Sequence, residues 1–266
     1  MSQVRLAATV ILARPNFEVY LARRSTSSAF APNAFVFPGG TIESADASAA
    51  AQSRTLGLES ERLTRMFRAE IASDLHSSEP PIEPGAARAL LVAALRELFE
   101  EAGILLARTA GMQPIAAEAA EWGRVEAERV RVRGGELGFA DFLGAHDWYA
   151  DARELTLFSH WITPPSEPRR YNTHFFFAAA PPEQAALADA FEMHDGIWIA
   201  PGDALARHRR GEMHLVYPTI KHLERLSAFD SLDAALRFAR SKPIVTIMPH
   251  DTADDFAIPA RLEGAW

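Results

Sequence analysis

The nine residues RELFEEAGI, at positions 96–104, constrain this chain more than any other stretch. They lie within the segment 86–106, in which apolar residues recur at helical spacing. The helix should end at Gly103, because glycine readily adopts the left-handed backbone conformation that ends many helices. The segment holds three glutamates whose spacing puts them on one face of a helix: Glu97, Glu100 and Glu101. The sequence therefore predicts a long helix with one apolar side and one side that carries three carboxylates.

Three like charges on one helix face repel each other unless a cation lies among them. Arg96 can offset part of this repulsion, but a divalent cation would offset more, because carboxylate oxygens are ligands that suit Mg²⁺ and Mn²⁺. The alternative is a solvent-exposed face on which arginine and glutamate pair. The spacing alone leaves both interpretations open.

The composition limits the kinds of site that are available. The chain of 266 residues has no cysteine, which excludes disulfides, thiol catalysis and cysteine-ligated metals. A net charge of −8 disfavours binding to long nucleic acid, although a local basic cluster could hold one small anion. No apolar run approaches the roughly 20 residues of a membrane helix, and the N-terminus lacks the apolar core of a signal peptide. We therefore expect a cytoplasmic protein without a membrane segment.

Strand-like and helix-like patterns are interleaved along the chain. We predict strands at 4–12, 17–24, 155–163, 171–179, 196–200 and 243–249. We predict helices at 59–75, 86–106, 114–133, 140–150, 201–211, 218–227 and 231–241. No long Gly/Ser linker and no repeat divides these elements, so the sequence indicates one α/β (α+β) domain over residues 1–266.

Residues 96–104 resemble the second half of the Nudix box, the signature of the Nudix hydrolase family. The box reads Gly, five residues, Glu, seven residues, and then Arg-Glu-U-x-Glu-Glu-x-Gly-U, where U is a bulky apolar residue. Gly40 begins the box, and Asp46 stands where the family has Glu. The pattern would then place the arginine at position 54, but it occurs at 96, so 42 extra residues interrupt the box. This split is similar to that in a Nudix subgroup that includes peroxisomal coenzyme A diphosphatases.

The resemblance implies a fold and a reaction. The fold would be a Nudix α/β/α sandwich with a mixed sheet, carrying a helical insertion at about 48–88 inside the box and a second helical segment at about 112–150. An insertion at this place falls in a loop, where added residues are tolerated most easily. The reaction would be Mg²⁺- or Mn²⁺-dependent hydrolysis of a nucleoside diphosphate linked to another group, by attack of water on phosphorus.

The resemblance also gives roles to residues of the box. The metal ligands would be Glu97, Glu100, Glu101 and the backbone carbonyl of Gly39. Arg96 would orient a glutamate, Asp46 would pair with Arg96, and Glu43 would support this pair. Arg96 and Glu100 would therefore act in catalysis together with the general base. The base itself is open between Glu101 and Glu192, and Glu192 is equally explained as an exposed loop carboxylate.

Arginines outside the box could meet the substrate phosphates, because the planar guanidinium suits phosphate oxygens. Arg23 and Arg24 end the second predicted strand, and Arg169 and Arg170 lie in a proline-bounded loop. Surface charge explains either pair equally well. Phe35 could stack on a nucleotide base or belong to the core.

The non-phosphate half of the substrate stays open. Coenzyme A or an acyl-coenzyme A fits the subgroup, whose pattern has Arg and Gly where this chain has Ala29 and Asn33. One alternative is a pyrophosphatase that acts on ADP-ribose or NADH. Another is a nucleotide sensor without turnover, which would usually lack one of the metal glutamates. The 42-residue excursion could cover the substrate or form the contact of a homodimer.

Overall fold

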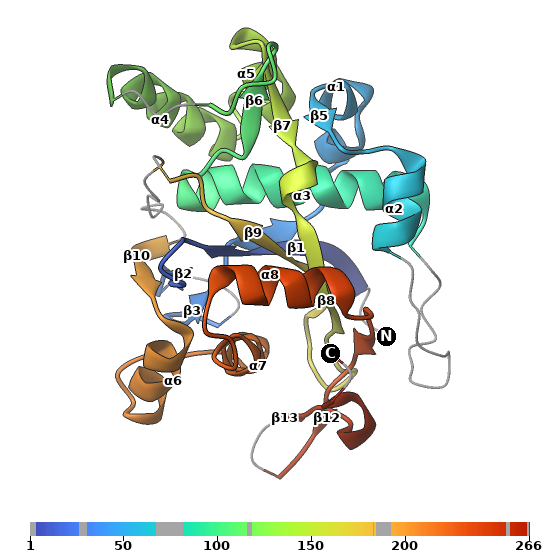
Figure 1. The fold of residues 1–266 in the computed structure, drawn as a ribbon, viewed down its shortest axis with the longest axis vertical. Helices are drawn as coiled ribbons and strands as arrows, with labels where there is room; N and C mark the ends of the chain where they lie inside the picture. The colour runs from blue at the N-terminus through green and yellow to red at the C-terminus, as the bar shows by residue number, and fades with distance from the viewer. Residues whose placement is uncertain are drawn as a thin grey trace.

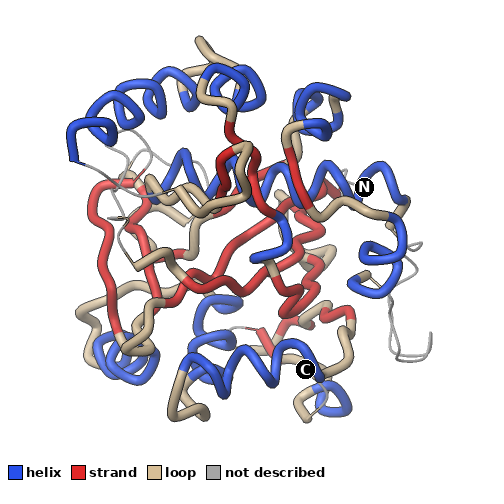
Figure 2. Tube along the Cα trace, turned by 45° about the horizontal axis from the view of Figure 1, so that its top comes forward, coloured by secondary structure: helices blue, strands red, loops and turns tan. Residues whose placement is uncertain are grey.

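The computed structural model describes residues 4–26, 31–67, 82–115, 119–182, 184, 193–253, 256–264 and 266. A mixed sheet lies at the centre of the molecule, and helices cover both of its faces (Figure 1). Figure 2 shows the same arrangement after a turn of 45°. The main path of the sheet runs β10-β2-β1-β9-β8-β11, with β3 paired to β2 and β4 paired to β1. The predicted α/β sandwich with a mixed sheet is thus confirmed.

The strands of the main sheet are β1 Val4–Ala13, β2 Val19–Arg24, β3 Phe35–Val36, β4 Gly39–Thr41, β8 Thr156–Ile162, β9 Arg170–Ala179, β10 Met193–Ile199 and β11 Thr246–Ile247. β1 pairs in parallel with β9 and antiparallel with β2 and β4. Val10 and Leu12 of β1 enter one core cluster, and Ile11 and Ala13 enter the other. Both faces of β1 are buried, so its apolar residues form a continuous run rather than alternating with polar ones. Only two residues of the strand predicted at 243–249 form β11.

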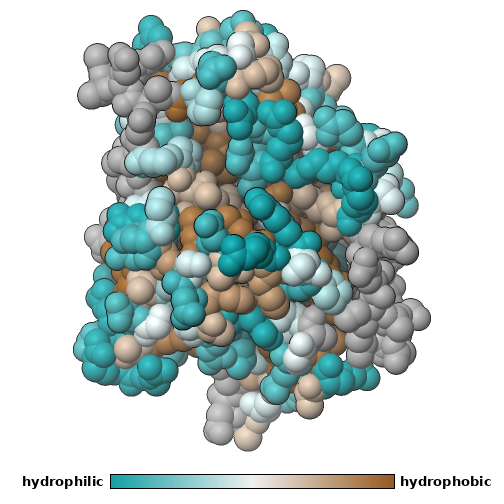
Figure 3. Space-filling model, in the orientation of Figure 1, coloured by the Kyte–Doolittle hydropathy of each residue, from teal (hydrophilic) through white to brown (hydrophobic). Residues whose placement is uncertain are grey.

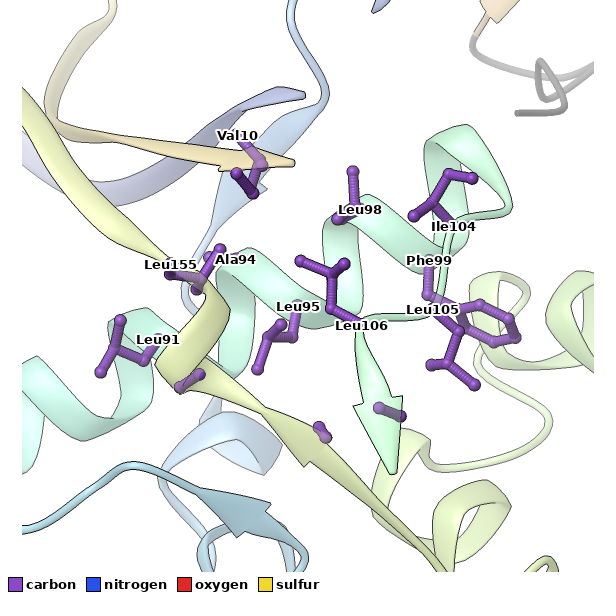
Figure 4. Packing of buried hydrophobic residues seen from close by; sticks show 14 of the residues in the cluster. Val10, Leu91, Ala94, Leu95, Leu98, Phe99, Ile104, Leu105, Leu106 and Leu155 are labelled. Carbon is purple, nitrogen blue, oxygen red and sulfur yellow. The ribbon is translucent and has the colours of Figure 1, made fainter. Parts of the chain in front are cut away.

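The predicted acidic helix is α3, Pro84–Ala102, which lies along one face of the sheet (Figure 1). It begins at a proline, whose missing N–H costs nothing in the first turn of a helix. It ends where predicted, because Gly103 takes a left-handed φ of 67°. Figure 4 shows apolar residues of α3 packed with residues from β1 and from the segment that follows the helix: Leu91, Leu95, Leu98, Val10, Leu106 and Leu155.

A second layer covers the other side of α3, and we call it the inserted layer. Its elements are α1 Ala49–Ser53, β5 Thr55–Leu56, α2 Ser60–Met66, β6 Ala107–Thr109, α4 Ala119–Arg133, α5 Phe139–Ala145, β7 Trp148–Asp151 and the 3-10 helix η3 Ala152–Glu154. These elements come from two segments of the chain, one before α3 and one after it. The two segments meet in a sheet of order β5-β7-β6, in which Thr55 pairs in parallel with Ala150. The excursion inside the box is therefore tied to the segment after α3 by strand pairing.

The sequence analysis expected only three helices in the inserted layer, so α1 and the three strands β5, β6 and β7 differ from the prediction. The helix predicted at 140–150 ends at Ala145, and Trp148–Asp151 form β7. Trp148 and Ala150 are buried where β7 pairs with its neighbours, and this tertiary packing outweighs local helix propensity. Of the helix predicted at 59–75, α2 is the described part, and residues 68–81 lie outside the described residues.

The opposite face of the sheet carries α6 Pro201–Arg209, α7 Tyr217–Leu226 and α8 Leu232–Ser241, followed by β12 His250–Asp251, β13 Phe256–Ala257 and η4 Ala260–Leu262 (Figure 1). A buried polar chain joins α7 to the sheet. Ser159 Oγ lies 2.6 Å from His222 Nε2, and His222 Nδ1 lies 2.6 Å from the carbonyl of Pro218. Burial lowers the pKa of His222 to about 3, so the ring is neutral, accepts from the serine and donates to the carbonyl. This Ser–His pair links α7 to β8, and both side chains are buried, so a substrate cannot reach them.

The surface drawn in Figure 3 mixes hydrophilic and apolar residues. Within the described ranges, the exposed large apolar side chains are Met112 and Val130. None of the described helices is both long enough and apolar enough to cross a membrane.

Candidate functional site

Arg96 lies at the centre of the acidic face of α3, and its side chain is 6% exposed. Its Nε and Nη2 donate to the two carboxylate oxygens of Asp46 at 2.9 and 3.0 Å. Its Nη1 donates to Glu97 at 2.9 Å and to Glu100 at 3.3 Å. Asp46 lies in the 3-10 helix η1, Ser44–Ala47, so this contact joins the two halves of the split box. The pairing of Arg96 with Asp46 survives the shorter side chain because η1 brings the aspartate close.

Glu43 stands at the rim of this network. Its backbone N–H donates to Asp46 at 2.8 Å, which stabilises the start of η1. Its own carboxylate is 4.0 Å from Arg96 and 63% exposed. Glu43 therefore adds a weak, solvent-screened charge to the site.

The loop with Gly39 and Gly40 lies directly against the carboxylates of α3. The N–H of Gly39 donates to Glu101 at 2.7 Å, and Glu101 is 3% exposed. A Cβ atom on Gly40 would lie 2.3 Å from Oε1 of Glu97. Only a glycine leaves room for Glu97 at this position, so the spacing of the box has a direct steric reason here.

The acidic face of α3 is buried. The three glutamates are therefore not part of a solvent-exposed helix face on which arginine and glutamate pair. Glu97 and Glu100 side chains are each 12% exposed. Burial raises the pKa of Glu97 to about 7, against the opposing effect of Arg96, and burial also raises the pKa of Glu100. One guanidinium therefore does not neutralise this cluster, and hard oxygen donors with excess negative charge suit a divalent cation.

The carboxylates are held by protein groups in this arrangement. Glu97 and Glu100 accept from Arg96, and Glu101 accepts from Gly39. Across the part of the chain that the structure describes, no three acidic or histidine side chains are grouped as metal ligands. A cation between them would therefore need the three carboxylate groups to draw closer together.

Comparison with known proteins decides the family. A family model for the NUDT19 Nudix domain matches residues 2–226. The chain belongs to this Nudix family. The resemblance seen in the split box is thus confirmed over most of the chain, and the box halves joined by Arg96 and Asp46 are those of a Nudix domain.

Two curated relatives are named acyl-coenzyme A diphosphatase NUDT19. The one from Gallus gallus is 31% identical over 86% of this chain and 66% of its own length. The one from Xenopus laevis is 27% identical over 84% of this chain and 63% of its own length. The chain thus spans slightly less than two thirds of the length of these relatives.

A solved Nudix hydrolase from Alicyclobacillus acidocaldarius has a similar fold. It is 26% identical, with a TM-score of 0.66 over 89% of this chain and 97% of that chain. This likeness confirms the Nudix fold in three dimensions.

The arginines predicted to bind phosphate lie at different places around the Nudix site. By strand alternation, Arg24 shares its side of β2 with Tyr20, which belongs to the core cluster of α3. Arg23 points to the other side, where it donates to Asn33 at 3.3 Å. Arg170 begins β9 and donates to the carbonyl of Thr163 at 3.0 Å.

Arg170 and its neighbour Arg169 are distant from the carboxylates along the sheet. Arg170 pairs with Val4 of β1, whereas Gly40 pairs with Ala8. Four residues of strand separate the two positions, or roughly 13 Å. The structure therefore does not bring this pair beside the Nudix glutamates.

Phe35 does not present a face to a nucleotide base. It is 9% exposed and packs in the core cluster on the far side of the sheet. Its strand, β3, pairs with β2, and its N–H donates to the carbonyl of His214, so both its backbone and its ring are used by the fold. The core interpretation of Phe35 is correct. Glu192 and Ala29 lie outside the described residues.

The sequence analysis missed one residue of the site, Arg129 of α4. Its guanidinium is buried and donates to the backbone carbonyl of Glu100. Arg129 stands at helical spacing from Val125 and Val132, which are buried, so the periodicity of α4 was the signal that could have placed it on the buried face.

Proposed function

We propose that this protein is a divalent-metal-dependent hydrolase that cleaves the pyrophosphate bond of a nucleoside diphosphate linked to another group. The observation that carries the proposal is the buried cluster of Glu97, Glu100 and Glu101, held by Arg96 and the Gly39 loop. Nudix-fold proteins without turnover would usually lack one of these glutamates, and this chain keeps all three. The cluster therefore favours an enzyme over a sensor.

Glu97, Glu100, Glu101 and the carbonyl of Gly39 would hold Mg²⁺ or Mn²⁺. When bound, the metal would neutralise phosphate charge and lower the pKa of the attacking water. Arg96, fixed by Asp46, limits the directions in which Glu97 and Glu100 can point. Glu101 accepts from the Gly39 N–H, which fixes its carboxylate beside the loop, and it would act as the general base that takes a proton from water.

The preferred substrate under this proposal is coenzyme A or an acyl-coenzyme A. The names of the curated relatives support it, and so does one feature of the loop before the box. Asn33 stands where the coenzyme A-associated pattern has glycine, and it takes a φ of 62°. Asparagine is among the non-glycine residues that tolerate this left-handed conformation best, so Asn33 can occupy a position that favours glycine.

A hydrolysis panel tests the proposal. Coenzyme A, an acyl-coenzyme A, ADP-ribose, NADH and a dinucleoside polyphosphate are incubated with and without Mn²⁺ or Mg²⁺, and the products are identified by mass. We expect metal-dependent cleavage of coenzyme A compounds that Glu101→Gln abolishes and that Glu136→Gln, at an exposed position, leaves intact. Preferred cleavage of ADP-ribose or NADH would contradict the proposed coenzyme A substrate. Tight binding without cleavage would favour a nucleotide sensor over an enzyme.

We propose a cytoplasmic protein, to be checked by cell fractionation of the natural host. We propose a homodimer, to be checked by light scattering coupled to size-exclusion chromatography.

A further inference from the structure

Two arginines among the described residues are almost completely buried, and both contact Glu100. Arg96 is 5% exposed and binds the Glu100 carboxylate. Arg129 is 3% exposed and donates to the Glu100 backbone carbonyl. Burying a guanidinium is unfavourable unless its donors are well paired, so the second arginine needs an explanation just as the first does.

Arg129 comes from the inserted layer, not from the Nudix box. It lies on α4, where Nε and Nη2 of its guanidinium donate to the two carboxylate oxygens of Glu126, with Nε to Oε2 at 2.8 Å. Glu126 and Arg129 are three residues apart on the same helix, so the helix holds the guanidinium in a fixed direction. The remaining nitrogen, Nη1, is the one that reaches α3.

The contact falls on the last turn of α3, which carries two of the proposed metal ligands. Carbonyls in the last turn of a helix have no partner within the helix, and α3 ends at Ala102. A cation at this end is also favoured by the helix dipole. Arg129 therefore caps the C-terminal end of α3, the turn that carries Glu100 and Glu101.

Tyr20 lies in the same core cluster as the apolar residues of α3. Its hydroxyl is buried, and no residue hydrogen bonds to it within the described structure. Burial raises the pKa of Tyr20, the charge of Glu101 raises it further, and the charge of Arg129 lowers it.

We infer that Arg129 is a positioning residue for the metal-binding turn of α3, supplied to the Nudix site by the inserted layer. Its guanidinium fixes the backbone of Glu100 and offsets the negative charge that gathers at Glu101. The inference rests on the proposed function, because it requires that Glu100 and Glu101 bind the metal. The inserted layer then contributes a residue to the metal site, in addition to packing against α3.

The test compares Arg129→Met with Arg131→Met, an exposed position on the same helix, and with Arg129→Lys. The Mn²⁺ dissociation constant is measured by electron paramagnetic resonance without substrate, and kcat, KM and the metal-free Tm are measured alongside. For Arg129→Met we expect about tenfold weaker Mn²⁺ binding and a kcat about tenfold lower, with KM changed less than about twofold. Arg129→Lys should recover part of both losses, and Arg131→Met should match the wild type.

The inference is overturned if Arg129→Met binds Mn²⁺ as tightly as the wild type, whatever its Tm. If Arg129→Met does not fold, Arg129→Lys and Glu126→Gln decide, and wild-type Mn²⁺ affinity in both would overturn it. A wild-type protein that binds no Mn²⁺ would refute the proposed function and this inference together. Mn²⁺ binding that Glu97→Gln removes but no Arg129 variant alters would refute the inference alone.

Discussion

Gly39 and Gly40 are adjacent in the chain but are required for different reasons. A Cβ atom on Gly39 would meet the backbone of β1, 2.4 Å from the carbonyl oxygen of Ala8. A Cβ atom on Gly40 would meet the flexible end of the Glu97 side chain. The first glycine is needed for the sheet to form, and the second is needed for the carboxylate to lie where it does.

The Gly40→Ala variant separates these roles. We expect a folded protein, destabilised by no more than about 1 kcal/mol, because the Glu97 side chain can move aside. Its kcat should fall about 100-fold, since the displaced carboxylate can no longer hold the metal in place. Gly202→Ala, which has open space around it, is the matched control and should change neither quantity. Wild-type activity in Gly40→Ala would contradict the steric reason for the box glycine.

The Asp46→Asn variant tests the bond between the two halves of the box. It removes the negative partner from a buried guanidinium, so we expect the free energy of unfolding to fall by about 3 kcal/mol in urea titrations. Glu43→Gln is the control, because that carboxylate is exposed and 4.0 Å from Arg96. Its effect should stay within about 0.5 kcal/mol. Equal effects of the two variants would show that Asp46 has no special role.

Glu97 makes the stability of the metal-free protein depend on pH. Its pKa is raised from 4.5 to about 7, so the folded state binds a proton more tightly than the unfolded state does. The ionised carboxylate therefore destabilises the fold above pH 7, and this penalty is relieved as the pH falls toward 4.5. We expect the metal-free Tm to rise as the pH is lowered from 8 to 6, and Glu97→Gln to lose this rise. A metal-free Tm with the same pH dependence in both proteins would contradict the assignment.

At the scale of elements, the inserted layer is fastened by Asp151 at the end of β7. This carboxylate accepts from Arg108 of β6 at 2.5 Å and from Arg153 of η3 at 2.7 Å. Hydrogen bonds from these arginines lower the pKa of Asp151 although burial raises it. One buried carboxylate thus links three elements of the layer.

The Asp151→Asn variant should loosen this layer. We expect a loss of about 3 kcal/mol in stability and faster amide hydrogen exchange in β5 and β6. Asp147→Asn is the control. Asp147 also forms an ion pair, with Arg54, but its side chain is 65% exposed, so the loss of its charge should matter little. Unchanged exchange in β5 and β6 of Asp151→Asn would mean that strand pairing alone holds the layer.

Elements with their own periodicity were predictable from the sequence, and elements made by distant pairing were not. α3, β1 and β9 carry apolar patterns long enough to identify them alone. β5 and β6 have two and three residues and exist only because β7 lies between them. The same divide runs through the site. The resemblance to the Nudix box predicted the contact of Arg96 with Asp46, but only the folded chain brings Arg129 to α3.

At the scale of the whole molecule, α3 is an interior helix with a sheet on one side and the inserted layer on the other (Figure 1). Removing the first part of the inserted layer would uncover the part of α3 that α1 and α2 cover. We expect a chain in which a short Gly/Ser linker replaces residues 49–82 to be insoluble or to unfold without cooperativity, as measured by circular dichroism. A soluble variant with a cooperative transition would show that the excursion is dispensable for folding.

The parallel pairing of β1 with β9 has a consequence for synthesis of the protein. Val4 lies beside Arg170, so a ribosome must add roughly 165 residues, over about 10–30 s, before the first strand meets its parallel neighbour β9. During that time the chain already contains both halves of the box but has no β9 on which to build the sheet. We expect productive folding to begin late in translation, and the nascent chain to depend on chaperones that bind its apolar first strand until then.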